Sequence, residues 1–476
     1  MTRLADLAPG ITGGEGARTV TGFAIDNRKV APGCVFGAFQ GARVNGEDFI
    51  PAAVAAGAIA VVARPQAKVE GALHIASAEP RRLFAQMAAR FHAPYPATIV
   101  AVTGTNGKTS TVELTRQLWH MVGEKSASIG TLGVTTSVDQ VSTGLTTPDI
   151  VTFLSNMAGL AREGIDHVAY EASSHGLAQY RSEALPVRAG AFTNLSRDHL
   201  DYHGTMEHYF AAKMRLFDEV IDTDGTAVIW ADDPRSGEVI DHARARGLHV
   251  MTVGAAGETL RLVERTPTQL GQTLVIEAEG ARYKVALPLI GAYQAANALT
   301  AAGLVLATGG VLARVLEHLA RVQPVRGRLE RAVITRAGAP VYVDYAHTPD
   351  GLRAAIEALR PHTAGRLITV FGAGGDRDAG KRPLMGEVAS DLSDHVIVTD
   401  DNPRSEDPGA IRAAILAGAP GAQEIAGRRD AIAAAIAQAG PQDIVLLAGK
   451  GHEQGQIIGD RVLPFDDVTV ARECAA

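Results

Sequence analysis

The sequence lacks the features that several large protein classes depend on. Its 476 residues include only two cysteines, Cys34 and Cys474, which lie near opposite ends of the chain. They exclude a disulfide framework and a cysteine-ligated metal site. Lys and Arg (45) are fewer than Asp and Glu (52), so the net charge is −7. This charge argues against a general nucleic-acid binder, whose affinity needs a positive field.

Long apolar runs are also missing. The first ten residues have no apolar core of a secretion signal, and no uninterrupted apolar run reaches the roughly 18 residues of a membrane span. Hydrophobic residues still make up 46% of the chain, which is enough for packed cores. The length suggests about three domains at roughly 150 residues each. We expect a soluble cytoplasmic enzyme without membrane or nucleic-acid partners.

The clearest functional motif is a glycine-containing loop, GTNGKTS, at residues 104–110. An apolar strand is predicted before it (99–102) and a helix after it (110–122). Glycines let backbone N–H groups approach phosphate oxygens, while Lys108 can reach the outer phosphates and the Thr109 hydroxyl can hold Mg²⁺. The full GxxxxGK[ST] spacing fails, because Val102 stands where its first glycine belongs. A plain glycine turn is the alternative, but the strand, lysine and threonine together favour phosphate binding.

Strands alternate with helices along the whole chain, which predicts an α/β fold with three domains. We expect a small N-terminal α/β domain (1–93), a central domain with a P-loop-type, mostly parallel sheet (94–322), and a C-terminal Rossmann-like α/β domain (323–476). Ligands of parallel sheets bind beyond the carboxyl ends of the strands. In the central domain, polar residues follow such ends: Glu171, Ser173, Asn194, Asp198 and His199. Each is weak evidence alone, and a single histidine is more often structural, so the prediction rests on their convergence.

Four predicted strands of the C-terminal domain also end in polar or glycine-bearing loops, within 341–347, 367–377, 395–404 and 444–453. The glycines at 372–375 lack the spacing of a dinucleotide fingerprint, so no NAD site is predicted. Elsewhere, a predicted helix (205–219) carries Lys213 beside an apolar stripe, which suggests partial burial. By themselves, the residues favour an ordinary surface lysine. Asn297 lies near the start of an alanine-rich helix that could present it to a base or phosphate.

Taken together, these motifs resemble those of the Mur ligases of peptidoglycan synthesis, nearly from end to end. TGTNGKTS (103–110) is similar to that family's shortened phosphate loop. Further matching motifs are EASSHGL (171–177), NLSRDHLDYH (194–203), YAHTPD (345–350), GGDRD (374–378) and GKGHE (449–453). The resemblance implies that a substrate carboxylate attacks the γ-phosphate of ATP and that an amine then attacks the acyl phosphate. It also implies ATP as co-substrate, Mg²⁺ as cofactor, small-molecule substrates and a monomer.

The resemblance assigns roles residue by residue. Lys108, Lys213 and His199 are the implied catalytic residues, and Lys213 matches a lysine that the family carboxylates. Thr109, Glu171, His199 and carboxylated Lys213 are the implied metal ligands. The implied ATP-binding residues are Gly104, Thr105, Asn106, Gly107, Lys108, Thr109, Ser110, Asn297 and His347, with Asp344, Arg326 and Arg328 nearby. The UDP-muramoyl-dipeptide is assigned to Asn27, Thr146, Thr147, Ser173, Gln179 and Arg181. Residues 24–28 and 40–46 match the family's uridine-binding region, and Asn27, Asn45, Leu145 and Gln294 depart from residues common in the family.

The added amino acid is predicted from the tetrapeptide DNPR at 401–404, which resembles that of the diaminopimelate-adding members. Diaminopimelate is lysine with an extra carboxylate, and an arginine can bind that group through two hydrogen bonds. The implied contacts are Arg377, Asp401, Asn402, Pro403, Arg404, Gly449 and Glu453. We therefore expect addition of meso-diaminopimelate to UDP-N-acetylmuramoyl-L-Ala-D-Glu. A lysine-adding ligase, a folate-polyglutamate ligase, and a nucleotide-dependent switch or transporter ATPase remain the alternatives.

Overall fold

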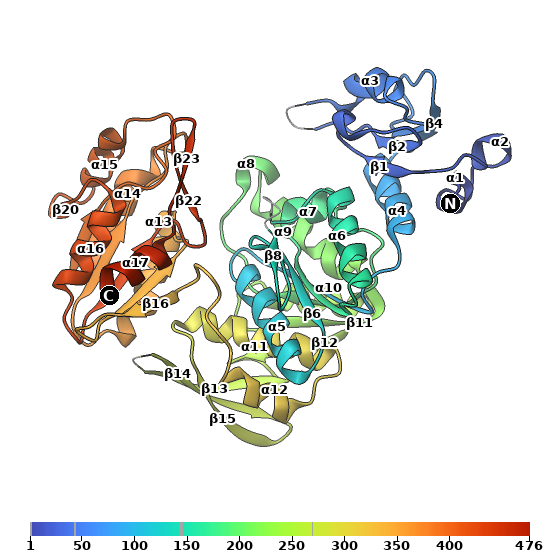
Figure 1. The fold of residues 1–476 in the computed structure, drawn as a ribbon. Coiled ribbons are helices and arrows are strands. Elements are labelled where there is room, and N and C mark those ends of the chain that lie inside the picture. The colour runs from blue at the N-terminus through green and yellow to red at the C-terminus, as the bar shows by residue number, and fades with distance from the viewer. Residues whose placement is uncertain (1, 42–43, 142–145, 269) are drawn as a thin grey trace. The chain divides into compact units, whose positions relative to one another are not determined.

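The computed structural model describes residues 2–41, 44–141, 146–268 and 270–476. The chain forms two compact units (Figure 1). The first contains Met1–Thr259 and Thr300–Val315, and the second contains Leu260–Leu299 and Leu316–Ala476. Helix α11 (Ala292–Ala307) passes from the second unit into the first. No helix of the described residues is both long and apolar enough to cross a membrane.

The N-terminal part of the first unit is a small sheet of four parallel strands in the order β1-β2-β3-β4. Its strands are β1 (Gly22–Ala24), β2 (Cys34–Gly37), β3 (Ala60–Ala63) and β4 (Leu73–Ala76). Helix α4 (Pro80–His92) covers one face, where the ring of Phe84 meets those of Phe23 and Phe39 edge-on, with centroids 5.2 and 5.4 Å away. Helix α3 (Ile50–Ala55) contributes Ile50 and Ala53 to the core on the other face. The short helices α1 (Leu4–Leu7) and α2 (Gly13–Gly16) precede the sheet.

The large sheet of the first unit has the order β12-β11-β10-β5-β9-β6-β7-β8. Its strands are β5 (Thr98–Thr103), β6 (Ser126–Gly130), β7 (Gly133–Thr135), β8 (Gln140–Val141), β9 (His167–Glu171), β10 (Val187–Phe192), β11 (Ile221–Trp230) and β12 (His249–Gly254). The six strands from β12 to β6 are parallel, and β7 and β8 extend the sheet antiparallel. Strand β5 has β9 and then β6 on one side and β10 on the other. Chain connections therefore diverge at β5, which is where such sheets bind ligands.

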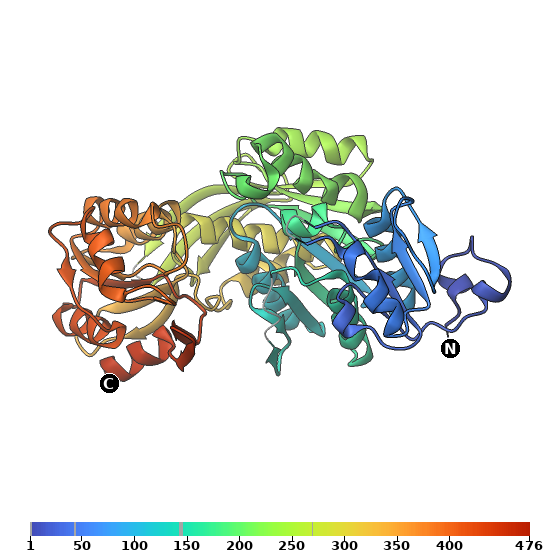
Figure 2. The same ribbon diagram turned by 90° about the horizontal axis from the view of Figure 1, so that it is seen from above.

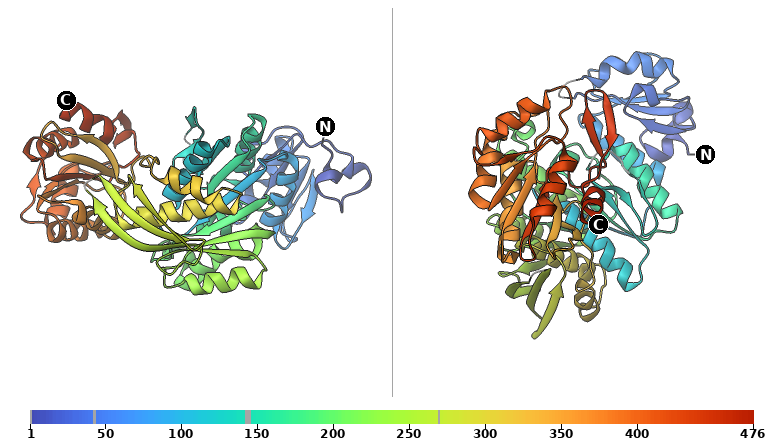
Figure 3. Two further views of the ribbon diagram at one scale, coloured as in Figure 1. Left: turned by 90° about the horizontal axis from the view of Figure 1, so that it is seen from below. Right: turned by 60° about the vertical axis from the view of Figure 1, so that its left-hand side comes forward.

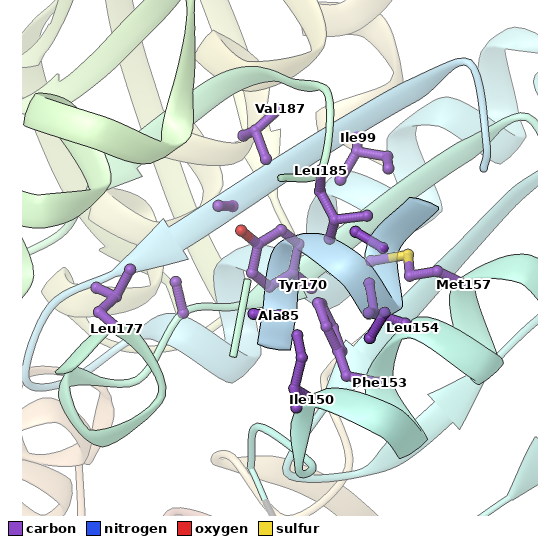
Figure 4. Close-up of a cluster of buried hydrophobic side chains, with 14 of the residues drawn as sticks. Ala85, Ile99, Ile150, Phe153, Leu154, Met157, Tyr170, Leu177, Leu185 and Val187 are labelled. Carbon is purple, nitrogen blue, oxygen red and sulfur yellow. The ribbon is translucent and has the colours of Figure 1, made fainter. Parts of the chain in front are cut away.

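Side chains alternate between the two faces of this sheet, and helices cover both faces (Figure 3, left). On one face, α6 (Ile150–Arg162) and α10 (Ser236–Ala245) join α4 in a single core. Tyr170 of β9 is buried at its centre, with its ring centroid 5.1 Å from that of Phe153 (Figure 4). On the other face, α5 (Lys108–Val122) is joined to the end of α11, because Trp119 Nε1 donates to Thr308 Oγ1 at 3.1 Å. The start of α5 lies at the carboxyl end of β5, because only residues 104–107 separate the two elements.

The second unit contains three antiparallel strands, a six-stranded sheet and a hairpin. The antiparallel strands are β13 (Leu260–Thr268), β14 (Gly271–Ala278) and β15 (Ala281–Leu287). The six-stranded sheet has the order β16-β17-β21-β18-β19-β20, antiparallel between its first two strands and parallel elsewhere. Its strands are β16 (Glu330–Ile334), β17 (Pro340–Asp344), β18 (Leu367–Phe371), β19 (His395–Val398), β20 (Gln423–Glu424) and β21 (Ile444–Ala448). The hairpin is β22 (Gly455–Ile458) with β23 (Arg461–Pro464).

Helices lie on both sides of the six-stranded sheet (Figure 2). Helices α13 (Pro349–Leu359), α14 (Lys381–Leu392) and α15 (Pro408–Leu416) share one core with it. Helices α16 (Arg428–Gln438) and α17 (Asp467–Ala475) share the core of the opposite face. The helices cover the two faces of the sheet. The polar loops predicted from the sequence follow the carboxyl ends of β17, β18, β19 and β21.

Two predicted helices differ in detail from those observed. The helix expected from residue 110 begins at Lys108, so Lys108 and Thr109 lie in its first turn. The helix expected over 205–219 is α9 (Met206–Arg215), followed by a wider turn over Leu216–Val220. Leu145, and residues 42–43 of the expected uridine-binding region, lie outside the described residues.

Candidate active site

The phosphate loop is held in shape by the segment that follows β10. Asn194 accepts hydrogen bonds from Thr105 N and Asn106 N through its carbonyl and Oδ1, both at 2.9 Å. Ser196 N donates to Thr105 Oγ1 at 2.9 Å. Gly104 has φ of +144°, and a Cβ there would lie 1.9 Å from Thr193 Oγ1, so this position requires glycine. The loop is thus preformed at the N-terminus of α5, where the helix dipole favours anions.

Two lysine ammonium groups meet at one carbonyl oxygen of this loop. Lys108 Nζ donates to Gly104 O at 2.9 Å and to Thr105 O at 2.8 Å. Lys213 Nζ donates to the same Gly104 O at 2.7 Å. Two like charges this close repel each other, so the arrangement favours an uncharged Lys213 or an anion between the two.

Lys213 is 1% exposed, so the interpretation of it as an ordinary surface lysine is wrong. Tyr209 lies one turn earlier on α9, and Lys213 Nζ lies 4.3 Å from the centroid of its ring. Burial lowers the pKa of Lys213 well below its usual value, and the charge of Lys108 lowers it further, against an opposing effect of Asp198. The pKa shift favours a neutral, nucleophilic amine, which is the form that reacts with CO₂.

Glu171 lies at the end of β9, next to β5, and is 2% exposed. Its Oε1 accepts from Thr131 N at 2.7 Å, and its Oε2 accepts from Thr131 Oγ1 at 3.3 Å. No basic side chain among the described residues forms an ion pair with it. A buried carboxylate without a cation is costly, and carboxylate and hydroxyl oxygens suit Mg²⁺. Glu171 and the buried Thr109 hydroxyl therefore fit the predicted metal site.

His199 lies on the loop before α8 (Leu200–His203) with φ of +53°. Its ring centroid lies 4.8 Å from that of His175 and 6.0 Å from that of Tyr209, the residue that also contacts Lys213. Burial lowers the pKa of His199. Its imidazole is thus favoured in the neutral form, which can ligate a metal ion.

Five of the six residues predicted to bind the nucleotide substrate form a connected cluster. Thr147 Oγ1 donates to Glu171 O at 2.8 Å and lies 2.9 Å from Ser173 Oγ. Arg181 donates to Thr147 O at 2.6 Å and to Gln179 Oε1 at 2.7 Å. Thr146 joins through Thr131, because their hydroxyl oxygens lie 3.1 Å apart.

The sixth residue, Asn27, lies in the small N-terminal sheet region. It begins a short 3₁₀ helix (Asn27–Lys29) whose N-cap is Asp26. Arg28 pairs with Asp26 at 2.7 Å and lowers the pKa of that carboxyl to about 2. Asn45 caps a second 3₁₀ helix (Gly46–Phe49), since its Oδ1 accepts from Glu47 N at 3.2 Å. Asn45, one of the departures from the family pattern, therefore serves as a helix cap here.

The second unit gathers the residues predicted to bind the amino acid. Arg404 has φ of +53°, and its Nη1 donates to Gly375 O at 2.8 Å. Asn402 Nδ2 donates to Glu453 Oε2 at 2.8 Å. A Cβ on Gly449 would lie 2.7 Å from Asp401 Oδ2, so the ends of β19 and β21 approach closely. Two predicted residues complete the group: Pro403, and Arg377, which is exposed and donates to Asp376 O at 3.3 Å.

The remaining predicted ATP contacts also belong to the second unit. Asn297 is 3% exposed and its Nδ2 donates to Gln294 Oε1 at 3.2 Å, and its contact with ATP stays a prediction. The ring centroids of His347 and Tyr345 lie 4.6 Å apart. The guanidinium of Arg328 lies over the Tyr345 ring, 5.0 Å from its centroid. Arg326 pairs with Asp466 at 3.0 Å.

Asp344 is buried at the end of β17. Its carboxylate accepts from Leu329 N at 2.8 Å and from Ala346 N at 2.9 Å. Burial raises the pKa of Asp344 to about 6, although Arg328 opposes the shift. The side chain fixes the chain entering this domain, which favours a structural role beside the predicted nucleotide contacts.

Comparison with known proteins shows the family to which this chain belongs. Residues 19–93, 102–305 and 327–451 match the Mur ligase catalytic, middle and glutamate ligase domains. A protein of Zymomonas mobilis named UDP-N-acetylmuramoyl-L-alanyl-D-glutamate–2,6-diaminopimelate ligase is 64% identical over 458 residues, covering 95% of this chain and 94% of that protein. The chain belongs to the Mur ligase family.

Other Mur ligases extend the similarity. A protein of the same name from Bradyrhizobium diazoefficiens is 54% identical and covers 95% of this chain and 94% of its own. A solved structure of that name matches with a TM-score of 0.76 at 32% identity, covering 100% of this chain and 98% of the other. MurF from Acinetobacter baumannii has a TM-score of 0.63 at 19% identity, covering 94% and 95%, which shows a shared fold. The predicted α/β fold class with mostly parallel sheets is confirmed.

Lys450 and Tyr209 were not among the predicted site residues, although each contacts one that was. Lys450 bonds Asn402, and Tyr209 contacts Lys213. The available signals were the position of Lys450 inside the GKGHE motif and the four-residue spacing between Tyr209 and Lys213. Neither signal is specific without the three-dimensional contacts.

Proposed function

We propose that this chain is an ATP-dependent amide ligase that adds meso-2,6-diaminopimelate to UDP-N-acetylmuramoyl-L-alanyl-D-glutamate in peptidoglycan precursor synthesis. The observation that carries the proposal is the convergence of Lys108 and the buried Lys213 on Gly104 O. Lys108 supplies positive charge for the triphosphate, and the neutral amine of Lys213 beside it can be carboxylated to hold a metal cation.

The reaction has two steps. The substrate carboxylate attacks the γ-phosphorus of ATP, which forms a C–O–P bond and releases ADP. The amine of the incoming amino acid then attacks the acyl carbon, the C–O bond to phosphate breaks, and the amine loses a proton. Lys108 and the loop N–H groups favour the first step because they stabilise negative charge on the transferring phosphoryl group.

Thr109 and Glu171 would hold one Mg²⁺ ion, and His199 with carboxylated Lys213 would hold a second. These ions would neutralise phosphate and carboxylate charge. Two observations support the assignment: the buried carboxylate of Glu171 has no cationic partner among the residues described, and Lys213 is favoured as a neutral amine. Carboxylation would turn that amine into an anionic oxygen ligand.

The nucleotide substrate would contact Asn27 and the cluster of Thr146, Thr147, Ser173, Gln179 and Arg181. ATP would contact the loop of residues 104–110 together with Asn297 and His347. Arg404 and Arg377 would bind the distal carboxylate of diaminopimelate, and Glu453 its ammonium, beside Asp401, Asn402, Pro403 and Gly449.

The proposal includes three functional segments: 1–93 for the uridine nucleotide, 94–322 for ATP, and 323–476 for the amino acid. It also includes a cytoplasmic location and a monomer without membrane or nucleic-acid partners. A lysine-adding ligase is the second candidate within the family. Arg404 opposes it, because L-lysine has no second carboxylate for that guanidinium to bind.

Omitting one substrate at a time tests this proposal. ADP formation is measured with ATP and Mg²⁺, and then with the UDP-muramoyl-dipeptide, meso-diaminopimelate, or both added. A ligase forms ADP together with a UDP-muramoyl-tripeptide, identified by mass spectrometry, only when all substrates are present. ADP formation that needs neither of the other substrates would instead indicate a switch or a transporter ATPase.

A further inference from the structure

Lys450 lies two residues after the end of β21 with 0% of its surface exposed, among the residues predicted to bind the amino acid. Its ammonium donates three hydrogen bonds, one for each of its protons. The acceptors are Gly455 O at 2.7 Å, Asn402 Oδ1 at 3.1 Å and Glu453 Oε2 at 3.4 Å. All its donors are therefore used within the protein, so Lys450 has none left for a ligand.

These bonds determine which way the amide of Asn402 points. Asn402 Oδ1 accepts from Lys450 and also from Ile457 N at 3.0 Å, which uses both of its lone pairs. Asn402 Nδ2 donates one hydrogen to Glu453 Oε2 at 2.8 Å. Its second N–H has no partner among the described residues. A flipped amide would place an NH₂ group against an ammonium and a backbone N–H, which is unfavourable.

The same network leaves Glu453 with one oxygen for a ligand. Its Oε2 accepts from both Asn402 and Lys450, while its Oε1 has no hydrogen bond within the part of the chain described. Arg404 uses only Nη1 and its backbone groups in the bonds observed, so its other donors remain. Asn402 and Arg404 thus both keep donors on one loop, where Arg404 Nη1 lies 3.5 Å from Asn402 O, and Glu453 keeps one acceptor oxygen.

We infer that Lys450 is a positioning residue that fixes the Asn402 amide and so sets the pocket to receive a carboxylate beside Arg404 and an ammonium beside Glu453. This inference rests on the proposed function, in which the amino acid carries both groups at its distal end. Lys450 makes the pocket selective without contacting the substrate. It favours diaminopimelate over L-lysine because only diaminopimelate has a second, distal carboxylate for the Asn402 donor.

Lys450 also supports the loop that carries Arg404. Its contact with Gly455 O and the bond from Ile457 N to Asn402 both involve β22. The next bonds along this strand hold Arg404 itself: Arg404 N donates to Ile457 O at 3.0 Å, and Gly459 N donates to Arg404 O at 2.7 Å. Loss of Lys450 therefore disturbs both donors that face the carboxylate.

The test compares steady-state kinetics of the full-length wild type with those of Lys450→Met, a substitution of similar length without charge. We expect the KM for diaminopimelate to rise about tenfold or more, while the KM values for ATP and the nucleotide substrate stay unchanged. The preference for diaminopimelate over L-lysine in kcat/KM should fall by a similar factor. A purely structural role would lower kcat through loss of folded enzyme and leave these KM values alone.

A matched control is Arg366→Met, in the same unit but at the amino end of β18. Arg366 pairs with Asp443 at 2.8 Å, and its loss should reduce stability without changing any KM. Asn402→Asp is a second variant that keeps the inference testable if Lys450→Met does not fold. It replaces the Nδ2 donor with an acceptor, so it should lose the same preference.

An unchanged KM for diaminopimelate in folded Lys450→Met, or an unchanged preference in Asn402→Asp, would overturn the inference. A wild-type enzyme that shows no diaminopimelate-dependent turnover would instead refute the proposed function. The two failures are therefore distinct.

Discussion

Replacing Lys213 with methionine should stabilise the protein and abolish its activity. Methionine has similar length and no charge, so the change removes a buried amine that shares Gly104 O with Lys108. Replacing buried ionisable groups by apolar residues of similar volume is often neutral or stabilises by roughly 1–4 kcal/mol. The lost hydrogen bond costs about 1 kcal/mol, and Gly104 O keeps Lys108 as a partner. We expect a net gain of about 1–3 kcal/mol.

The gain should depend on pH in a defined direction. Burial lowers the pKa of Lys213, so between its folded and unfolded pKa values the unfolded state binds a proton that the folded state lacks. Wild-type stability therefore rises with pH between the folded pKa and the unfolded value of about 10.4. Lys213→Met lacks this contribution. Its advantage over the wild type should be greatest at low pH and shrink as the pH rises.

Urea unfolding at several pH values, in buffer free of bicarbonate and Mg²⁺, measures this difference while Lys213 stays uncarboxylated. Phosphate release with all substrates present measures activity. Lys125→Met is the matched control, because Lys125 is an exposed lysine of the same unit. It should change stability by no more than about 0.5 kcal/mol and keep its activity. A less stable Lys213→Met, an advantage that grows with pH, or retained turnover would refute the reasoning.

Lys108→Ala should leave the fold intact and abolish phosphate release, because the loop loses the cation that reaches the outer phosphates. Circular dichroism checks the fold, and retained turnover would remove the loop from the mechanism. Arg404→Ala should raise the KM for diaminopimelate by about 10- to 150-fold, equivalent to roughly 1.5–3 kcal/mol for a charged hydrogen bond. An unchanged KM in steady-state kinetics would contradict the binding of the distal carboxylate by Arg404. Because the pKa of Asp344 is raised to about 6, the folded state keeps a proton that the unfolded state releases above about pH 4. Urea unfolding should thus show the wild type losing about 3 kcal/mol relative to Asp344→Asn between about pH 4 and 7, and no change in that difference would exclude a raised pKa.

The sequence was sufficient for features that depend on local order. The run of strand, GTNGKTS and helix predicts the phosphate loop because its neighbours in sequence are also its neighbours in space. Polar residues after several parallel strands predict a shared edge for a different reason, because parallel strands end at the same edge of their sheet. The structure does bring Asn402, Arg404 and Glu453 together in this way.

Contacts between distant segments could not be predicted. The burial of Lys213 depends on Gly104, 109 residues earlier in the chain. Helical periodicity placed Lys213 only beside an apolar stripe, so the residues by themselves favoured exposure. Lys450 reaches Asn402 across 48 residues, and no pattern in the sequence specifies that bond. The sequence also did not indicate that Asn297 would be buried with Gln294, one turn earlier, as its hydrogen-bond partner.

The central claim is that this chain joins diaminopimelate to the nucleotide substrate, with Arg404 selecting the amino acid. The most direct measurement is phosphate release by the purified protein with ATP, Mg²⁺ and UDP-N-acetylmuramoyl-L-Ala-D-Glu, comparing meso-diaminopimelate with L-lysine. We expect turnover with diaminopimelate and little or none with L-lysine. A preference for L-lysine would contradict the role of Arg404, and phosphate release without either amino acid would contradict the ligase assignment itself.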